Sequence, residues 1–273
     1  MSLLDPTRVG PRLRPVHRPI PFVTLRVVVA LILREMTSTY GRTPGGYAWA
    51  VLEPVAGVVI MAWIFSLGLR HPALGTNFAI FYATGIMPFW VFTQVSSAVS
   101  QSLRYSRQLL SYPRVTVLDA LLARFILNVM LQLLISYIII AGIRLVNDTG
   151  TTLVLPRILL GFAMAAALAA GIGVFNCVLM TAFPLWQSAW SIATRPLMLL
   201  SGVIFMIEKV PEPWRGYLEW NPLVHVVAEV RAGFYFGYHP DYVSPAYVFL
   251  VSFVAMALGV FFTWRFYREA LEA

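Results

Sequence analysis

The sequence has 273 residues, of which 59% are hydrophobic and 12% are charged, and its mean hydropathy is +0.75. A soluble domain carries about twice that share of charged residues, so a water-soluble protein is excluded. The basic residues behind the formal charge of +8 are nearly all arginines at the edges of apolar runs, a placement that suits anionic lipid headgroups better than nucleic acid.

The chain begins with a segment that mixes proline and arginine. Residues 1–21 hold five prolines and four arginines, a composition that resists helix formation and supplies no core. We therefore expect a disordered basic tail there.

Residues 22–46 are interpreted as an amphipathic interface helix. Their apolar run, residues 27–33, lies between Arg26 and the pair Arg34 and Glu35, and falls short of the roughly twenty residues that cross hydrocarbon. Such a helix would lie along the membrane surface with its arginines among the headgroups. A helix that packs on the soluble side is the alternative.

Six later stretches are long and apolar enough to span a membrane. They cover about residues 48–69, 78–100, 116–145, 157–183, 187–207 and 245–266. The predicted fold class is therefore all-α integral membrane, with residues 47–273 as a six-span domain. An even number of spans places both termini on one side.

Arginines indicate which side this is. Arg104, Arg107 and Arg114 lie between the second and third spans, and Arg265 and Arg268 follow the sixth. Because positively charged connections stay in the cytoplasm, both termini are predicted to be cytoplasmic. The connection after the fourth span carries no charge and gives no such indication.

The fourth span carries a small residue at every fourth position. These residues are Gly161, Ala165, Ala169 and Gly173. A ridge of this kind lets another helix approach closely, and we interpret it as a packing surface.

Charged side chains inside a span are costly unless they find a partner, a wet cavity or a position near the membrane edge. Arg195 lies in the middle of the fifth span and is the most costly. It either lines an aqueous path or forms a buried pair, with Glu53 as the candidate partner. Asp119 and Arg124, in the first turns of the third span, are expected to reach headgroup water.

Aromatic residues flank Glu53 and Arg195. They belong either to an interfacial belt or to a surface on which a polymer stacks. The candidate substrate-channel residues are Trp49, Glu53, Tyr82, Phe89, Trp90 and Arg195.

The segment 101–115, between the second and third spans, is too polar for lipid and too apolar for a free loop. We expect it to dock on a cytoplasmic partner, with apolar side chains in a groove and arginines opposite acids. An ordinary connector is the alternative. The candidate coupling residues are Arg104, Arg107, Leu109, Leu110, Tyr112 and Pro113.

Residues 208–244 predict short helices on the opposite side. Asn221 followed by Pro222 is a strong helix start, and the helix that follows is too short to cross, so it is re-entrant or lies on the surface. His225 and Glu229 share one face, and no histidine has metal-ligand spacing. The candidate exit residues, which guide a sugar chain or anchor the segment, are Trp214, Trp220, Asn221, His225, Glu229 and Arg231.

Motifs for enzymatic chemistry are missing. The sequence contains no phosphate-binding loop ending in Gly-Lys-Ser/Thr, no Gly-x-Ser-x-Gly and no zinc motif. The chain is therefore expected to be no enzyme and to hold no cofactor. A helical bundle with a docking element and no energy source points to a permease driven by a separate ATPase.

Several segments together carry a family resemblance. They are Leu33-Arg-Glu-Met, Tyr40-Gly41, Gly46-Tyr-Ala-Trp-Ala-Val-Leu-Glu-Pro54, Gly85-Ile-Met-Pro-Phe89, Phe183-Pro184, Arg195-Pro196 and Trp220-Asn-Pro-Leu-Val-His-Val-Val-Ala-Glu-Val-Arg231. With them, residues 22–269 resemble the permease of capsular-polysaccharide exporters, in the type-2 branch of the ATP-binding-cassette (ABC) transporters. The last segment is the most specific.

The resemblance implies a homodimer in the bacterial inner membrane, with two cytoplasmic ATPase subunits that bind ATP and Mg²⁺. Its substrate would be a lipid-linked, usually acidic polysaccharide, and its further partners a periplasmic co-polymerase and an outer-membrane export protein. It also implies an interface helix at the start, a coupling element that includes residues 109–113, and exit helices after Glu208. Leu185 and Trp186 stand where relatives often carry charged residues, which argues against an ionic ATPase contact at that connection.

Three alternatives stay open at this point. The first is an exporter of O-antigen, teichoic acid or small lipids, and the second is a membrane-embedded glycolipid transferase. The third is an ion channel, which is disfavoured because no span has a polar face along its whole length.

Overall fold

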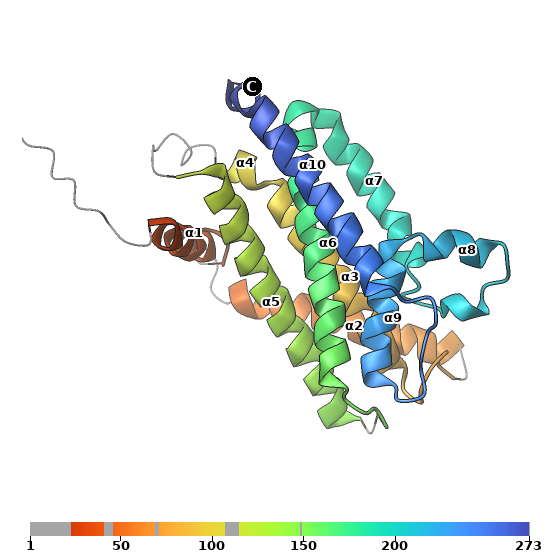
Figure 1. The fold of residues 1–273 in the computed structure, drawn as a ribbon. Helices are drawn as coiled ribbons and strands as arrows, with labels where there is room; N and C mark the ends of the chain where they lie inside the picture. Colours follow the sequence, from red (N-terminus) through yellow and green to blue (C-terminus); the bar gives the residue numbers. More distant parts are fainter. Residues whose placement is uncertain (1–22, 41–45, 69–70, 107–114, 148, 273) are drawn as a thin grey trace, which may run out of the picture.

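The computed structural model of the chain describes residues 23–40, 46–68, 71–106, 115–147 and 149–272. Within these ranges every regular element is a helix (Figure 1). The predicted tail over residues 1–21 lies outside the described residues.

Helix α1 (Val23–Tyr40) is the predicted interface helix, and its main packing partner is α5 (Val117–Val146). Figure 1 shows α1 crosswise to α5 at the side of the bundle. Leu25, Val29 and Leu33, which are four residues apart, form an exposed apolar stripe along α1. The helix therefore has a protein-facing side and a separate apolar side that is free in this chain.

The interior of the bundle is formed by α3 (Phe78–Ser100), α6 (Leu155–Ala182) and α9 (Pro222–Phe234). These three helices pack on one another, while α5 covers α3 and α10 (Pro245–Glu272) runs along α6. Every residue from 223 to 234 is buried. Helix α9 is therefore an interior helix of this chain, and the alternative of a surface helix is wrong.

The small-residue ridge of α6 explains how α9 and α3 come so close. A Cβ atom added to Gly161 would lie 2.5 Å from Val230 Cγ2 on α9, and one on Gly173 would lie 2.8 Å from Val99 Cβ on α3. The close approach predicted from the sequence is confirmed. The structure adds that the ridge serves two different helices.

Helices α2 (Gly46–Gly68) and α7 (Pro184–Leu200) are the least covered parts of the bundle. No residue of α7 is buried, and Val58 is the one core residue of α2 among its described side chains. Large apolar side chains on α2, such as Trp63, are exposed instead. Surfaces of this kind suit lipid or another membrane helix.

Among the described residues, five helices are long and apolar enough to cross a membrane: α2, α3, α5, α6 and α10. They coincide with five of the six stretches chosen from the sequence. Helix α7 has 17 residues, covers residues 187–200 of the predicted fifth span (187–207) and is not among the five. The fifth predicted span therefore stays a prediction.

The bundle has two ends that carry different short elements (Figure 1). One end holds α4 (Ser102–Ser106), the start of α5 and the connection from α6 to α7. Toward the other end lie α9, α8 (Trp214–Glu219) and the 3₁₀ helix η1 (Ile207–Lys209). They are named the α4 end and the α9 end below.

Candidate functional site

The six candidate channel residues divide into two groups. Trp49 and Glu53 on α2 and Arg195 on α7 are exposed on this chain, whereas Tyr82 and Phe89 on α3 are buried. Trp90 is partly buried on the same helix as Tyr82 and Phe89. Among the described residues no ion pair joins Glu53 to Arg195, so the buried pair considered from the sequence does not form within one chain.

Tyr82 faces α2 rather than an open path. Its ring lies 5.9 Å from the ring of Phe65 on α2, measured between centroids. The contact holds α2 against α3, where Val58 also enters the core. Tyr82 therefore has a packing role in this chain.

At the α4 end, Arg104 bonds within the chain. Its Nη1 donates to Oε1 of Gln187 at 2.7 Å, and its Nη2 donates to the Met180 carbonyl oxygen. Met180 lies in the last turn of α6 and Gln187 in the first turn of α7. The uncharged connection between these helices therefore lies beside α4, a neighbourhood that the sequence did not reveal. Arg107, Leu109, Leu110, Tyr112 and Pro113 lie outside the described residues.

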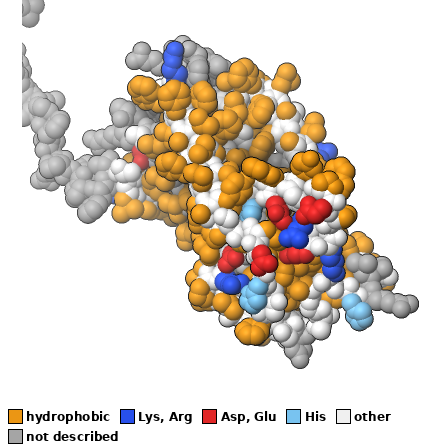
Figure 2. Space-filling view, turned by 45° about the vertical axis from the view of Figure 1, so that its right-hand side comes forward, with side chains coloured by type: hydrophobic (Ala, Val, Ile, Leu, Met, Phe, Trp, Pro, Cys, Tyr) orange, Lys and Arg blue, Asp and Glu red, His pale blue; other side chains and the backbone are white. Residues whose placement is uncertain are grey.

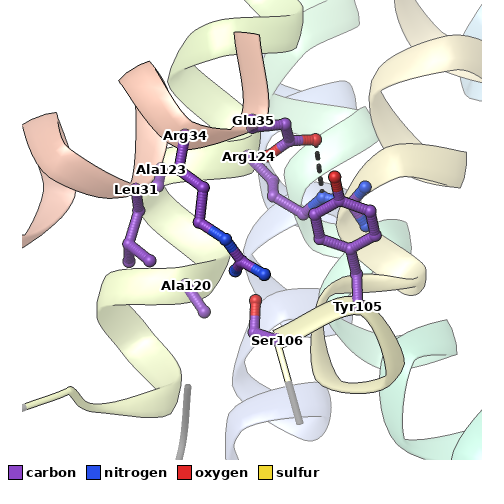
Figure 3. Close-up of a pocket in the computed structure, with 8 residues that line it drawn as sticks. All are labelled: Leu31, Arg34, Glu35, Tyr105, Ser106, Ala120, Ala123 and Arg124. Carbon is purple, nitrogen blue, oxygen red and sulfur yellow. Dashed lines mark hydrogen bonds and ion pairs between the residues drawn. The ribbon is translucent and has the colours of Figure 1, made fainter. Parts of the chain in front are cut away.

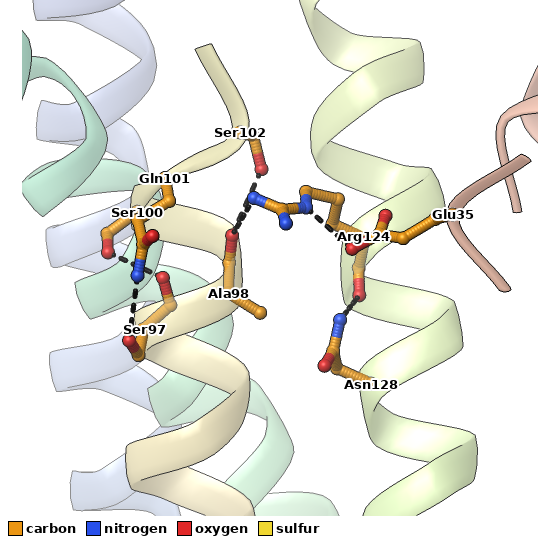
Figure 4. A network of polar contacts seen from close by, with 8 residues as sticks. All are labelled: Glu35, Ser97, Ala98, Ser100, Gln101, Ser102, Arg124 and Asn128. Atoms are coloured by element: carbon orange, nitrogen blue, oxygen red, sulfur yellow. Dashed lines mark hydrogen bonds and ion pairs between the residues drawn. The ribbon is translucent and has the colours of Figure 1, made fainter. Parts of the chain in front are cut away.

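Asp119 and Arg124 have partners inside the protein. Asp119 forms a capping box with Thr116: Thr116 Oγ1 accepts from the Asp119 N–H at 3.2 Å, and Asp119 Oδ2 accepts from the Thr116 N–H at 3.0 Å. Arg124 pairs with Glu35 of α1, its Nε lying 2.8 Å from Glu35 Oε1, and both side chains are nearly buried (Figure 4). The expectation that Asp119 and Arg124 extend to headgroup water is wrong, because this end of α5 is covered by α1 and α4.

At the α9 end, Asn221 caps α9 as predicted. Its Oδ1 accepts from the Leu223 N–H at 3.0 Å. Its Nδ2 donates to Ser201 Oγ at 3.1 Å and so connects α9 to the end of α7.

His225 is held between two backbone groups. Its Nδ1 accepts from the Ser244 N–H at 3.2 Å, which leaves the proton on Nε2, and Nε2 donates to the Glu219 carbonyl at 2.8 Å. The ring therefore joins the end of α8 to the segment before α10. Within the described residues, no three histidine, cysteine or acidic side chains gather into a metal site.

Arg231 is the most deeply buried charge at this end, with 2% of its surface exposed. Its guanidinium donates to the carbonyls of Gly202 and Val203, each at 2.7 Å, and lies 4.3 Å from the centroid of the Phe81 ring. Burial lowers the pKa of Arg231 to about 10, so the side chain stays protonated at neutral pH. Arg231 therefore holds the turn after α7 against α3 and α9.

Two acids at the α9 end have different surroundings. Glu229 is buried on α9, and burial raises the pKa of its carboxyl although the charge of Arg157 opposes the shift. Glu208 is exposed and accepts from the Tyr238 hydroxyl at 2.6 Å. Burial is also the main cause that raises the pKa of Tyr238.

An open groove lies beside His225, with Trp220, Tyr242 and Tyr247 among its lining residues. Glu219 also lines it and pairs with Arg215 at 2.8 Å. Figure 2 shows charged and histidine side chains gathered in one part of a mostly apolar face. Aromatic faces beside a carboxylate can stack on sugar rings and accept hydrogen bonds from their hydroxyls.

Trp214 and Trp220 are exposed at the same end, 65% and 75% respectively. The structure therefore brings Trp220 and His225 together at the groove, while Glu229 and Arg231 are inside the bundle.

The residues that sequence reasoning missed are Glu35, as the partner of Arg124, and Gln187, as the partner of Arg104. The single acidic residue of a helix that otherwise carries only basic charges was the available signal for the first.

Known proteins that are similar to most of the chain include transport proteins for capsular polysaccharides. Polysialic acid transport protein KpsM of Escherichia coli is 28% identical over 246 residues, which cover 90% of this chain and 94% of that protein. Capsule polysaccharide export inner-membrane protein CtrC of Neisseria meningitidis is 27% identical over 241 residues, 88% of this chain and 91% of that protein.

A more distant relative is the O-antigen export system permease protein RfbA of Klebsiella pneumoniae. It is 19% identical over 248 residues, 88% of this chain and 93% of that protein. The family described as ABC-2 type transporter matches residues 26–235, a range from α1 to the end of α9. The chain belongs to the ABC-2 type transporter family.

Proposed function

We propose that the chain is the membrane-spanning subunit of an ATP-driven exporter of lipid-linked, acidic capsular polysaccharide. The observation that carries the proposal is similarity along nearly the whole length of both chains to a polysialic acid transport protein and to a capsule polysaccharide export protein. The subunit works as a homodimer in the bacterial inner membrane with two ATPase subunits. These partners bind ATP and Mg²⁺, and the chain itself is no enzyme.

The α4 end faces the cytoplasm in this proposal, and α7 is the fifth of six spans, with α10 as the last. Arg104 supports this orientation, because its bonds place the uncharged connection before α7 at the same end as the arginine-rich connection before α5. Helix α1 lies along the membrane surface, with the stripe of Leu25, Val29 and Leu33 in the lipid.

The exposed faces of α2 and α7 meet a second copy of the chain and border the substrate path. Trp49, Glu53 and Arg195 lie on these faces and are open to another surface in the single chain. The guanidinium of Arg195 offsets the charge of an acidic sugar chain, and an aromatic ring offers it a stacking face. Trp90, which is partly buried on α3, borders this path, while Tyr82 and Phe89 support it from inside the bundle.

The groove at Trp220 and His225 receives the sugar chain on the periplasmic side. Its open form and its three aromatic side chains support this role. A periplasmic co-polymerase and an outer-membrane export protein then take the polymer onward.

The experiment is export in proteoliposomes that contain the chain and its ATPase, with lipid-linked capsular polymer as the substrate. We expect ATP-dependent movement of that polymer, and at least roughly threefold less per ATP for Arg195→Ala, as for other residues that modulate a coupled step. Arg144→Ala, which removes an exposed arginine at the α9 end of α5, is the control. Movement of O-antigen in place of capsular polymer would favour the O-antigen exporter.

A further inference from the structure

Arg124 of α5 contacts three other helices at once, although it was not among the candidate site residues. Besides its ion pair with Glu35 on α1, its Nη1 donates to the Ala98 carbonyl of α3 at 3.1 Å (Figure 4). Its guanidinium also lies 4.2 Å from the centroid of the Tyr105 ring on α4. Figure 3 shows Glu35, Tyr105 and Arg124 meeting at a small pocket between α1, α4 and α5.

Each contact restrains a different helix. Ala98 lies in the last turn of α3, where carbonyls lack partners within the helix and a positive charge is favoured. The same carbonyl accepts from Ser102 Oγ at the start of α4, at 3.4 Å. The planar guanidinium suits both the hydrogen bonds and the ring of Tyr105, which the point charge of a lysine does not reproduce.

The ion pair adds a charged contact to the packing of α1 on α5. Helices α1 and α4 both pack on α5 and make no extensive contact with each other, so a shift of α4 reaches α1 through α5, where Arg124 touches both. Glu35 and Arg124 are 10% and 12% exposed. Because a buried charge left without its partner is strongly destabilising, the two side chains move together rather than separate.

Helix α4 is therefore held by arginines on two sides. Arg104 fastens it to the connection between α6 and α7 through hydrogen bonds to neutral groups. Arg124 fastens it to α1, α3 and α5 through a buried charge. Besides its packing on neighbouring helices, α4 thus has two polar links into the bundle, and only the second includes an ion pair.

We propose that Arg124 is a positioning residue for energy coupling, through which displacement of α4 is transmitted to α1 and to the end of α3. This inference rests on the proposed function, in which a partner ATPase acts on the segment that contains α4. Arg124 acts through Glu35, Ala98 and Tyr105 and touches neither substrate nor nucleotide.

The test compares Arg124→Gln, Arg124→Lys, Glu35→Gln and the double variant Glu35→Gln with Arg124→Gln in the complete permease–ATPase complex. ATP hydrolysis and polymer export are measured together in proteoliposomes. We expect Arg124→Gln to lower polymer exported per ATP roughly threefold to thirtyfold, while hydrolysis and bound ATPase stay near wild type. The double variant should be no worse than Arg124→Gln, because both changes remove one link.

Arg124→Lys should lie between wild type and Arg124→Gln, since it keeps the charge and loses the planar contacts. Arg144→Gln is the matched control, an exposed arginine on the same helix at the opposite end. Export per ATP by Arg124→Gln equal to that of Arg144→Gln overturns the inference, and so does an equal fall in hydrolysis, export and bound ATPase. Should Arg124→Gln fail to fold, the polymer exported per ATP by Glu35→Gln tests the inference instead, against the same control.

Hydrogen exchange of the complex tests the link without the substrate. On binding a non-hydrolysable ATP analogue, amide protection should change in both α1 and α4 of the wild type, and in Arg124→Gln the change in α1 should be lost. An unaltered α1 response in Arg124→Gln contradicts the inference. A wild-type complex that hydrolyses ATP and exports no capsular polymer contradicts the proposed function instead. Hydrogen exchange then still tests the link between α4 and α1, because it requires no substrate.

Discussion

The α9 end holds a buried arginine, Arg231, and the α4 end holds a nearly buried one, Arg124, but their surroundings differ. Arg231 donates to backbone carbonyls of a single turn, that of Gly202 and Val203, and His225 likewise bridges two backbone groups. Arg124 instead meets the side chains of Glu35 and Tyr105 on two separate helices. Polar contacts of Arg231 and His225 at the α9 end thus end on backbone groups, whereas the ion pair at the α4 end joins side chains of two separate helices.

The sharpest test of this difference is Arg231→Met. The substitution keeps an apolar side chain in the site and leaves the Gly202 and Val203 carbonyls without their donor, so the free energy of unfolding should fall by about 3 kcal/mol or more. Denaturant unfolding in mixed micelles measures it. Lys209→Met, an exposed cation at the same end, should change stability by less than about 0.5 kcal/mol. A loss for Arg231→Met as small as the Lys209 value would show that the turn after α7 needs no anchor.

Arg104→Ala should have a smaller effect. The residue is exposed and its hydrogen bonds end on Gln187 and Met180, so the expected loss in stability is about 1 kcal/mol. The same unfolding measurement applies, with Arg144→Ala as the control. Losses of similar size for Arg104→Ala and Arg231→Met would remove the contrast between the two ends.

Glu229→Gln should have the smallest effect, and of opposite sign. Because burial raises the pKa of the Glu229 carboxyl in the folded state, the native protein holds this proton more tightly than the unfolded chain does. Stability from this group is therefore lost as the pH rises from the ordinary value of 4.5 through the raised value. At neutral pH, Glu229→Gln should gain up to about 1 kcal/mol and flatten the pH dependence.

The control for this prediction is Glu212→Gln, which replaces an exposed acid at the same end and should change stability at neutral pH by less than about 0.5 kcal/mol. Melting temperatures between pH 4.5 and neutral pH measure both variants. A loss of stability for Glu229→Gln at neutral pH would mean that the attraction of Arg157 outweighs burial.

Local sequence was enough to find most of the helices. Five apolar stretches match helices of spanning length, Asn221 caps α9, and the ridge from Gly161 to Gly173 packs closely as expected. These features depend on side-chain size, hydropathy and capping chemistry within a few turns of one helix, so they can be read along a single segment.

The hydrogen-bond and ion-pair partners of the arginines could not be predicted from a single segment. Arg124 was expected in headgroup water and instead meets Glu35, which is 89 residues away in the chain. Arg104 meets Met180 and Gln187, which are 76 and 83 residues away. Whether an arginine is solvated or buried depends on which distant helices cover it, and that coverage arises only when the bundle packs.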